Sequence, residues 1–126
     1  MSQFDSLIIG EVAQDTNVDY DGTTVHAVGG AVYYSGFAAA NTGHKTAVLP
    51  KADLAAAFAP APNVTVYPLH SRTSFVTKNV YHTPDRERRT STVDSVIEPY
   101  RTEEVPDIDA AIWHLAGLAA GDIPNE

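Results

Sequence analysis

One helix between two apolar strands constrains the fold of this chain more than any other feature. The stretch from Ala31 to Asn41 is built of small and apolar residues, which predicts a buried helix, and Gly43 stands where a helix C-terminal glycine belongs. Apolar strands are predicted on either side of it, over Ser6–Gly10 and Lys45–Pro50. Because a helix that joins two buried strands is typical of a βαβ unit, the sequence predicts an α/β fold with a parallel sheet.

Two hairpins interrupt this parallel pattern. Turn residues Asp21-Gly22 predict a hairpin over Val18–Val28, which follows a polar segment, Glu11–Asn17, that we interpret as irregular. The second hairpin has arms over Thr73–Thr83 and Arg89–Ile97. Its second arm is rich in Thr and Ser, so these arms are poorly suited to a core and well suited to a sheet that covers something.

The remaining segments predict short elements. A helix is expected over Ala52–Phe58, a strand over Asn63–Leu69 and a loop from Glu98 to Asp109. A further buried strand is expected from Ala110 to Leu118, which would make His114 a core histidine. The last residues resemble the start of a helix with Asp122 as its cap.

The composition of the 126 residues narrows the classes of function. The length fits one compact domain, and the formal net charge is −8. The only basic cluster is Arg86, Arg88 and Arg89, which we interpret as a solvated hairpin tip, so no nucleic-acid partner is expected. Cysteine is absent, which excludes disulfides and thiolate zinc sites. No signal peptide and no apolar stretch of about 20 residues is present, so we expect a cytoplasmic protein with no membrane partner.

No metal site is predicted from the residue pattern. The segment Asn17–Gly22 imitates the start of a calcium loop, but Val28 stands at the twelfth position, where a bidentate glutamate is needed. No two of the five histidines have the i, i+4 spacing of a helical zinc site.

Two features are candidates for binding a ligand. Gly29-Gly30 directly precedes the predicted helix, where backbone without side chains and free N–H groups approach a ligand closely; the alternative is a tight strand-to-helix turn. Asp15 follows the first strand, at the end of a parallel sheet where ligands bind, and its carboxylate suits sugar hydroxyls. The alternative for Asp15 is a turn-capping aspartate.

Three segments together resemble the N-terminal half of the PfkB (ribokinase-like) carbohydrate kinases. They are the opening segment Leu7–Asp15 (LIIGEVAQD), the double-glycine segment Gly29–Gly43 (GGAVYYSGFAAANTG) and the pair Thr73-Ser74. The resemblance covers nearly the whole chain from Ser6 onward. It implies a ribokinase-like parallel sheet with a protruding β-strand lid, truncated within residues 1–126, with lid strands at about 12–28 and 73–96.

The resemblance also assigns a substrate site. By analogy with the family, Asp15 binds the acceptor alcohol, Gly29 and Gly30 approach the acceptor through their backbone, and Tyr34 occupies a position of the glycine motif that faces it. The family's catalytic aspartate and ATP pocket belong to the C-terminal part, so we assign no catalytic residue here and leave open whether this chain is itself an enzyme. ATP and Mg²⁺ are implied for the complete enzyme only.

Departures from the family pattern bear on the acceptor. Ala13 and Tyr34 stand where many sugar-specific members have asparagines. The expected acceptor is therefore a sugar-like molecule other than ribose itself, a different polyol, a nucleoside or an aromatic-containing molecule, phosphorylated on an alcohol. The alternative is a non-catalytic binding module, or a fragment that needs a partner chain. The resemblance also suggests a homodimer that pairs through the lid.

Overall fold

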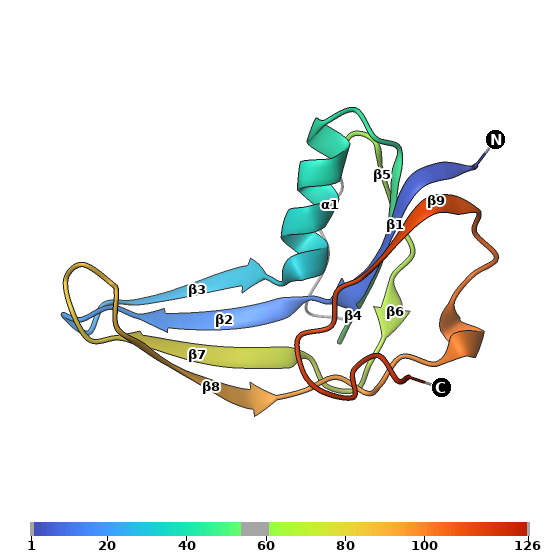
Figure 1. The fold of residues 1–126 in the computed structure, drawn as a ribbon. Coiled ribbons are helices and arrows are strands. Elements are labelled where there is room, and N and C mark those ends of the chain that lie inside the picture. Colours follow the sequence, from blue (N-terminus) through green and yellow to red (C-terminus); the bar gives the residue numbers. More distant parts are fainter. Residues whose placement is uncertain (1, 54–60, 126) are drawn as a thin grey trace.

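The structure is a computed structural model that describes residues 2–53 and 61–125. It has two sheets and one α-helix among these residues (Figure 1). The elements in chain order are β1 (Phe4–Glu11), β2 (Ala13–Val18), β3 (Thr24–Gly29), α1 (Ala31–Asn41), β4 (Thr46–Ala52), β5 (Val64–Val66), β6 (Leu69–His70), β7 (Phe75–Tyr81), β8 (Arg89–Ser95), the 3₁₀ turn η1 (Thr102–Glu104) and β9 (Ala110–Leu115).

The first sheet is parallel throughout. Its strand order is β5-β4-β1-β9, and β6 also pairs with β4. The central strands β1 and β4 are apolar and buried, because α1 packs across one face of them and the segment between β8 and β9 covers the other. The predicted βαβ unit is therefore confirmed, including the bounds of its helix and the left-handed Gly43 at the helix end, φ 89°.

The second sheet consists of β2, β3, β7 and β8 in the order β3-β2-β7-β8. The hairpins β2–β3 and β7–β8 are antiparallel, and β2 and β7 join them in parallel. Figure 1 shows this sheet extending away from the parallel sheet and α1 as a long, flat arm. Most of its side chains are exposed or half-buried, since no further layer of described residues packs on the arm beyond its base.

Glycine at position 30 allows the sharp corner between the second sheet and α1. Gly30 has φ 101° and ψ 153°, a backbone conformation adopted almost only by glycine. A Cβ atom there would lie 2.6 Å from the backbone oxygen of Glu11. The end of β1 and the start of α1 can therefore touch only because this residue has no side chain.

Three sequence-based expectations about strands and helices are wrong. The segment Glu11–Asn17 is not irregular, because β1 continues to Glu11 and β2 begins at Ala13. Strand β9 is present but largely exposed, since β1 is its single strand neighbour among the described residues. His114 on β9 is consequently exposed rather than a core residue.

The expectation for Asp122 is also wrong. No helix follows β9 within residues 116–125, and the Asp122 carboxylate instead accepts hydrogen bonds from backbone N–H groups of a turn, including that of Ala119 at 2.6 Å. In the expected helix Ala52–Phe58, Ala52 belongs to β4, and residues 54–60 lie outside the described part of the chain.

Candidate functional site

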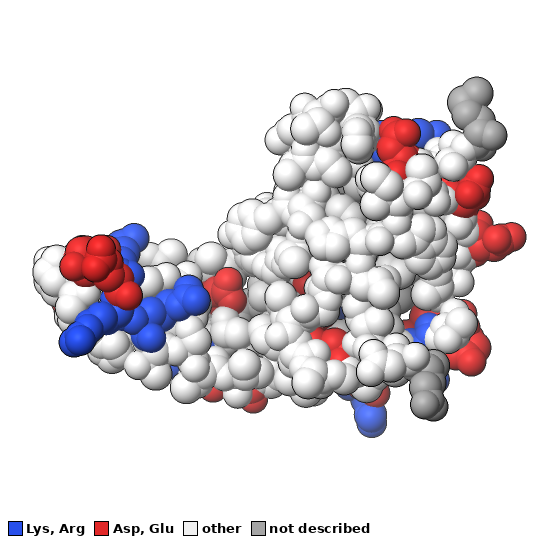
Figure 2. Space-filling view, viewed as in Figure 1, with Lys and Arg blue, Asp and Glu red and all other residues white. Residues whose placement is uncertain are grey.

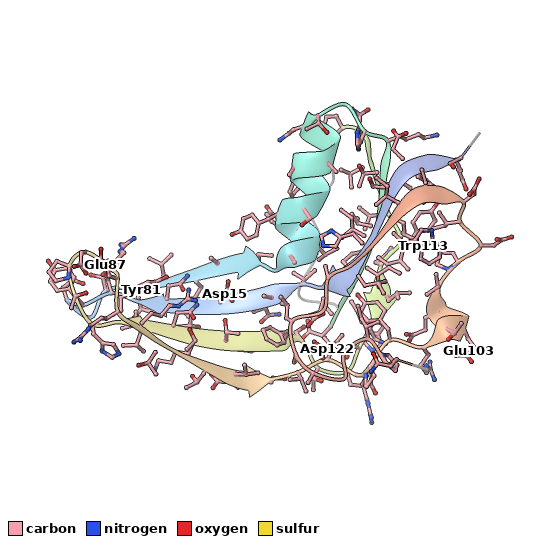
Figure 3. All side chains as sticks on the ribbon, in the orientation of Figure 1. Asp15, Tyr81, Glu87, Glu103, Trp113 and Asp122 are labelled. Atoms are coloured by element: carbon pink, nitrogen blue, oxygen red, sulfur yellow. The ribbon has the colours of Figure 1, made fainter. Side chains whose placement is uncertain are left out.

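Asp15 lies in the middle of β2, on the second sheet, half-buried near the base of the arm (Figure 3). Its cross-strand neighbours are Ala27 on β3 and Thr77 on β7. The Thr77 hydroxyl donates a hydrogen bond to Asp15 Oδ1, which fixes the orientation of the carboxylate. Asp15 is therefore a strand residue held by a neighbouring strand, and not a turn-capping residue.

Gly29 and Tyr34 lie beside the second carboxylate oxygen of Asp15. A Cβ atom built on Gly29 would lie 3.0 Å from Asp15 Oδ2 and 3.6 Å from the Tyr34 hydroxyl oxygen. A side chain at position 29 would thus crowd this carboxylate oxygen. The Tyr34 ring, 64% exposed, stands on the first turn of α1 and packs edge-on against Tyr33. The structure therefore brings Asp15, Gly29 and Tyr34 together.

Gly30 differs from Gly29 in what surrounds it. Its nearest neighbours are backbone atoms, Glu11 O at 2.6 Å and Ala13 N at 3.1 Å from a hypothetical Cβ. Gly30 also occupies the N-cap position of α1, where no side chain makes a capping hydrogen bond. This glycine is required by the corner of the fold itself, and it leaves the start of α1 without a side-chain capping hydrogen bond.

A row of polar side chains continues from Asp15 along the same face of the second sheet. Alternation places Asp15 and Asn17 of β2 on one face, next to Thr77 and Asn79 of β7. Asn79 Nδ2 donates to Asn17 Oδ1 at 2.9 Å, and Ser91 Oγ on β8 donates to Asn79 Oδ1 at 2.7 Å. These bonds connect three strands and hold hydroxyl, amide and carboxylate groups on one surface.

The outer end of the second sheet carries a cavity on this face. It has a volume of about 280 Å³ and is lined by Asn17, Asp19, Thr23, Val25, Tyr81 and Arg86. Arg86 forms an ion pair with Asp19 and lies over the Tyr81 ring. The hydrogen bond from Arg86 lowers the pKa of Asp19. Figure 2 shows Lys and Arg side chains gathered at this end of the arm, next to acidic ones.

A second cavity, of about 370 Å³, lies at the edge strand β3. Asp15 and Ala27 line it too, but most of its lining residues, including Gln14, Thr16 and His26, belong to the face opposite Asp15 by alternation. Thr16 Oγ1 and His26 Nδ1 are 3.2 Å apart there. This cavity is more open and lacks the connected polar row, so the Asp15 face is the stronger candidate site.

The comparisons with known proteins concern the fold of the chain. No family model matches the sequence, and no curated protein does so either. Among solved structures, a sulfate complex of a pyrophosphate-dependent kinase in the ribokinase family is 28% identical and has a TM-score of 0.81; the match covers 94% of this chain and 43% of that one. A ribokinase-family pyrophosphate-dependent kinase with a pyrophosphate analogue and myo-inositol is 26% identical, with a TM-score of 0.81, covering 94% and 42%.

A third solved structure extends the fold comparison. It is a pyrophosphate-dependent myo-inositol kinase with two leucine substitutions, 24% identical with a TM-score of 0.78, and the match covers 94% of this chain and 40% of that one. The chain thus spans less than half the length of all three structures. The chain corresponds to the N-terminal part of a ribokinase-like kinase fold. Nothing in these comparisons favours a non-catalytic interaction module.

Several residues of this candidate site were not predicted from the sequence. Thr77, Asn79 and Ser91 contact Asp15 or extend its polar row, yet they appeared only as members of a polar hairpin. The signal was the alternation of β7, in which Phe75, Thr77, Asn79 and Tyr81 share one face. The alternation alone does not show that β7 pairs with β2, and it is this pairing that places the face next to Asp15.

A buried ion pair lies beneath the ribokinase-like sheet, away from Asp15. Lys51 at the end of β4 is 1% exposed, and its Nζ contacts both carboxylate oxygens of Glu104 and the Pro99 carbonyl oxygen at 2.8–3.0 Å. Burial acts to raise the pKa of Glu104, but hydrogen bonding and charge from Lys51 outweigh it, so this pKa is lowered. Tyr100 lies beside the pair and donates to Leu49 O at 2.7 Å.

The described residues contain no cluster of three or more histidine, cysteine or acidic residues able to hold a metal ion. No metal-binding residue is therefore assigned within residues 2–53 and 61–125. Within the same ranges, no helix is both long and apolar enough to cross a membrane.

Proposed function

We propose that this chain forms the acceptor-binding part of a kinase that transfers a phosphoryl group to an alcohol of a sugar-like molecule or cyclic polyol. The observation that carries the proposal is the convergence of Asp15, Gly29 and Tyr34 at the base of the second sheet, continued by a polar row along one of its faces. In this proposal the second sheet acts as the lid over the acceptor.

Each residue has a separate task in binding the acceptor. Thr77 occupies one oxygen of Asp15, so the other oxygen remains to accept hydrogen bonds from acceptor hydroxyls. Gly29 leaves space beside that oxygen, and the uncapped start of α1 provides backbone N–H donors. The exposed Tyr34 ring offers an apolar face against which a ring of carbons can pack.

The polar row favours an acceptor with several hydroxyl groups. Asn17, Asn79 and Ser91 present both donors and acceptors, which suit vicinal alcohols rather than a single charged group. The solved ribokinase-family structure that contains myo-inositol supports a cyclic polyol as the first candidate. A sugar-like acceptor or a nucleoside is the second candidate, because the exposed Tyr34 ring also suits stacking.

The phosphoryl donor is a separate question. ATP with Mg²⁺ is the donor that the family resemblance implies, and two similar solved structures are of pyrophosphate-dependent kinases, so pyrophosphate is a second candidate. The described residues do not fit either donor, because they hold no metal-binding cluster and no Gly-Lys-Ser/Thr phosphate loop. We therefore assign to this chain acceptor binding and water exclusion, and no step of the transfer itself.

Calorimetric titration of the chain with myo-inositol and a panel of hexoses, pentoses, nucleosides, ATP and pyrophosphate tests the proposal. We expect one class of acceptor to bind, and Asp15→Asn to weaken this binding at least tenfold, because an amide loses an acceptor oxygen. Asp21→Asn is the matched control. Asp21 lies at the exposed β2–β3 turn, so its variant should bind as tightly as the original chain.

Two results would contradict the proposal. Acceptor binding that survives Asp15→Asn unchanged would separate binding from the Asp15 face. Binding of ATP or pyrophosphate without any alcohol acceptor would make this chain a donor site instead.

A further inference from the structure

Two buried carboxyl groups meet at the carboxyl end of the parallel sheet. Glu11 is the last residue of β1 and is fully buried, and Asp122, 3% exposed, lies in the turn that follows β9 (Figure 3). Neither belongs to the polar row around Asp15. Buried carboxyl groups are rare without a cation or several donors, so their partners are informative.

Both carboxyl groups contact the same backbone N–H. Leu118 N donates to Glu11 Oε1 at 2.8 Å and lies 3.3 Å from Asp122 Oδ2. Asp122 Oδ2 also accepts from Ala119 N at 2.6 Å. One amide thus brings oxygens of the two acids close together.

The remaining oxygen of Glu11 has no donor. Glu11 Oε2 is buried and, among the described residues, has no hydrogen-bond partner of its own. The side chains of Glu11 and Asp122 nevertheless approach each other, because both accept from the backbone N–H of Leu118. Two carboxylates cannot hydrogen-bond to each other, and two negative charges in a buried site repel. A proton between them resolves both problems.

Among the residues that the structure describes, no nearby cation provides an alternative. The three contacts of Lys51 Nζ, which stands beside Glu11 in the sheet register, go to Glu104 and Pro99 O. The hydroxyl of Tyr100 donates to Leu49 O. Three charged or titratable side chains face Glu11, namely those of Tyr100, Asp122 and Lys51. Of these, only Asp122 is positioned to share a proton with Glu11.

We propose that Glu11 and Asp122 share one proton and act as an acid pair that holds the turn 117–122 on the end of β1. Burial, followed by the hydrogen bond with Asp122, raises the pKa of Glu11 to about 8. Glu11 also supplies the backbone oxygen against which Gly30 packs, so the acid pair lies at the corner from which the second sheet departs. Loss of the proton places two charges in this corner and loosens the turn.

The direction of the pH dependence follows from the raised pKa. The folded state keeps the Glu11 proton up to about pH 8, whereas the unfolded chain releases it near its model value of 4.5. The folded state therefore binds more protons between these values, and this contribution to stability is lost as the pH rises toward 8. Above about pH 8 this contribution to the free energy of unfolding does not change further with pH.

Glu11→Gln tests the acid pair, because its amide replaces the shared proton with a permanent N–H donor to Asp122. We expect its unfolding equilibrium constant, relative to the original chain, to fall by up to about tenfold for each pH unit between about 5 and 8, and then to level off. The Glu103→Gln variant removes the same charge at an exposed position, so the pH dependence of its unfolding equilibrium constant should match that of the original chain. Parallel profiles for Glu11→Gln as well would overturn the proposal.

A second measurement uses the original chain first. In the original chain, the ¹³C shift of the Glu11 side-chain carboxyl carbon should titrate near pH 8. Above that pH the Leu118 and Ala119 amides should lose protection against hydrogen exchange, measured relative to the intrinsic exchange rate at each pH. In Asp122→Asn the Glu11 titration should move to lower pH. A Glu11 carboxyl that titrates near its ordinary value in the original chain would refute the shared proton.

Discussion

The two sheets of this molecule differ in how far their side chains are buried. Every residue of β4 is buried, and so is nearly every residue of β1, whereas β8 is exposed along almost its whole length. The parallel sheet is held by apolar side chains on both faces, and the second sheet by cross-strand hydrogen bonds among polar ones. The comparison indicates that the first sheet provides most of the stability of the fold. The second sheet retains a polar face that is available to bind a ligand.

Removing an ion pair should give the largest difference in stability loss between the two regions. Lys51→Met leaves the Glu104 carboxylate without its cation in a site where both side chains are largely shielded, so we expect the free energy of unfolding to fall by about 3–5 kcal/mol. Arg86→Ala removes an ion pair at the exposed tip of the second sheet and should leave stability almost unchanged. Urea denaturation of both variants measures the difference. Equal losses would mean that burial does not set the value of these pairs.

Two glycines with positive φ make the next comparison. Gly30→Ala adds a Cβ 2.6 Å from Glu11 O in a conformation that disfavours side chains, so we expect a loss of at least about 3 kcal/mol. Gly22→Ala, at the β2–β3 turn, meets no atom within 4 Å and should lose only about 1 kcal/mol from backbone strain. If thermal or urea unfolding showed the two variants to be alike, the close approach at the corner would be unimportant.

Matched valine substitutions give the smallest expected difference. Val48 on β4 is fully buried, and Val93 on β8 is 56% exposed. We expect Val48→Ala to lower the free energy of unfolding by about 2 kcal/mol and Val93→Ala by less than about 0.5 kcal/mol. A large effect at Val93 would instead indicate that the exposed face of the second sheet is covered in solution, for example by a second copy of the chain.

The parallel unit could be predicted from the sequence because local pattern and tertiary role agree there. The small and apolar residues of α1, ended by Gly43, lie between apolar strands, and this pattern leaves few other folds open. The segment Glu11–Asn17 was misread because a half-buried strand with polar side chains on both faces shows no apolar alternation. Burial of β9 was misread because apolar sequence predicts burial only when another element covers the strand.

Some residues of the candidate site could be predicted from the sequence, but their arrangement in space could not. Asp15, Gly29 and Tyr34 were singled out from the family resemblance, and the structure brings them together. Thr77 and Asn79 could not be placed, because the pairing between β2 and β7 joins segments about sixty residues apart. The carboxyl pair of Glu11 and Asp122 is equally non-local, and nothing in the sequence around either residue indicates the other.

The most direct test of the central claim is an NMR titration of the ¹⁵N-labelled chain with myo-inositol. Our account predicts that amide shifts concentrate at Asp15, Gly29 and Thr77, extend along the polar face of the second sheet, and spare the exposed strand β9. Shift changes centred on β9 or on the opposite face of the second sheet would contradict it. So would the absence of any shift with every acceptor of the panel at millimolar concentration.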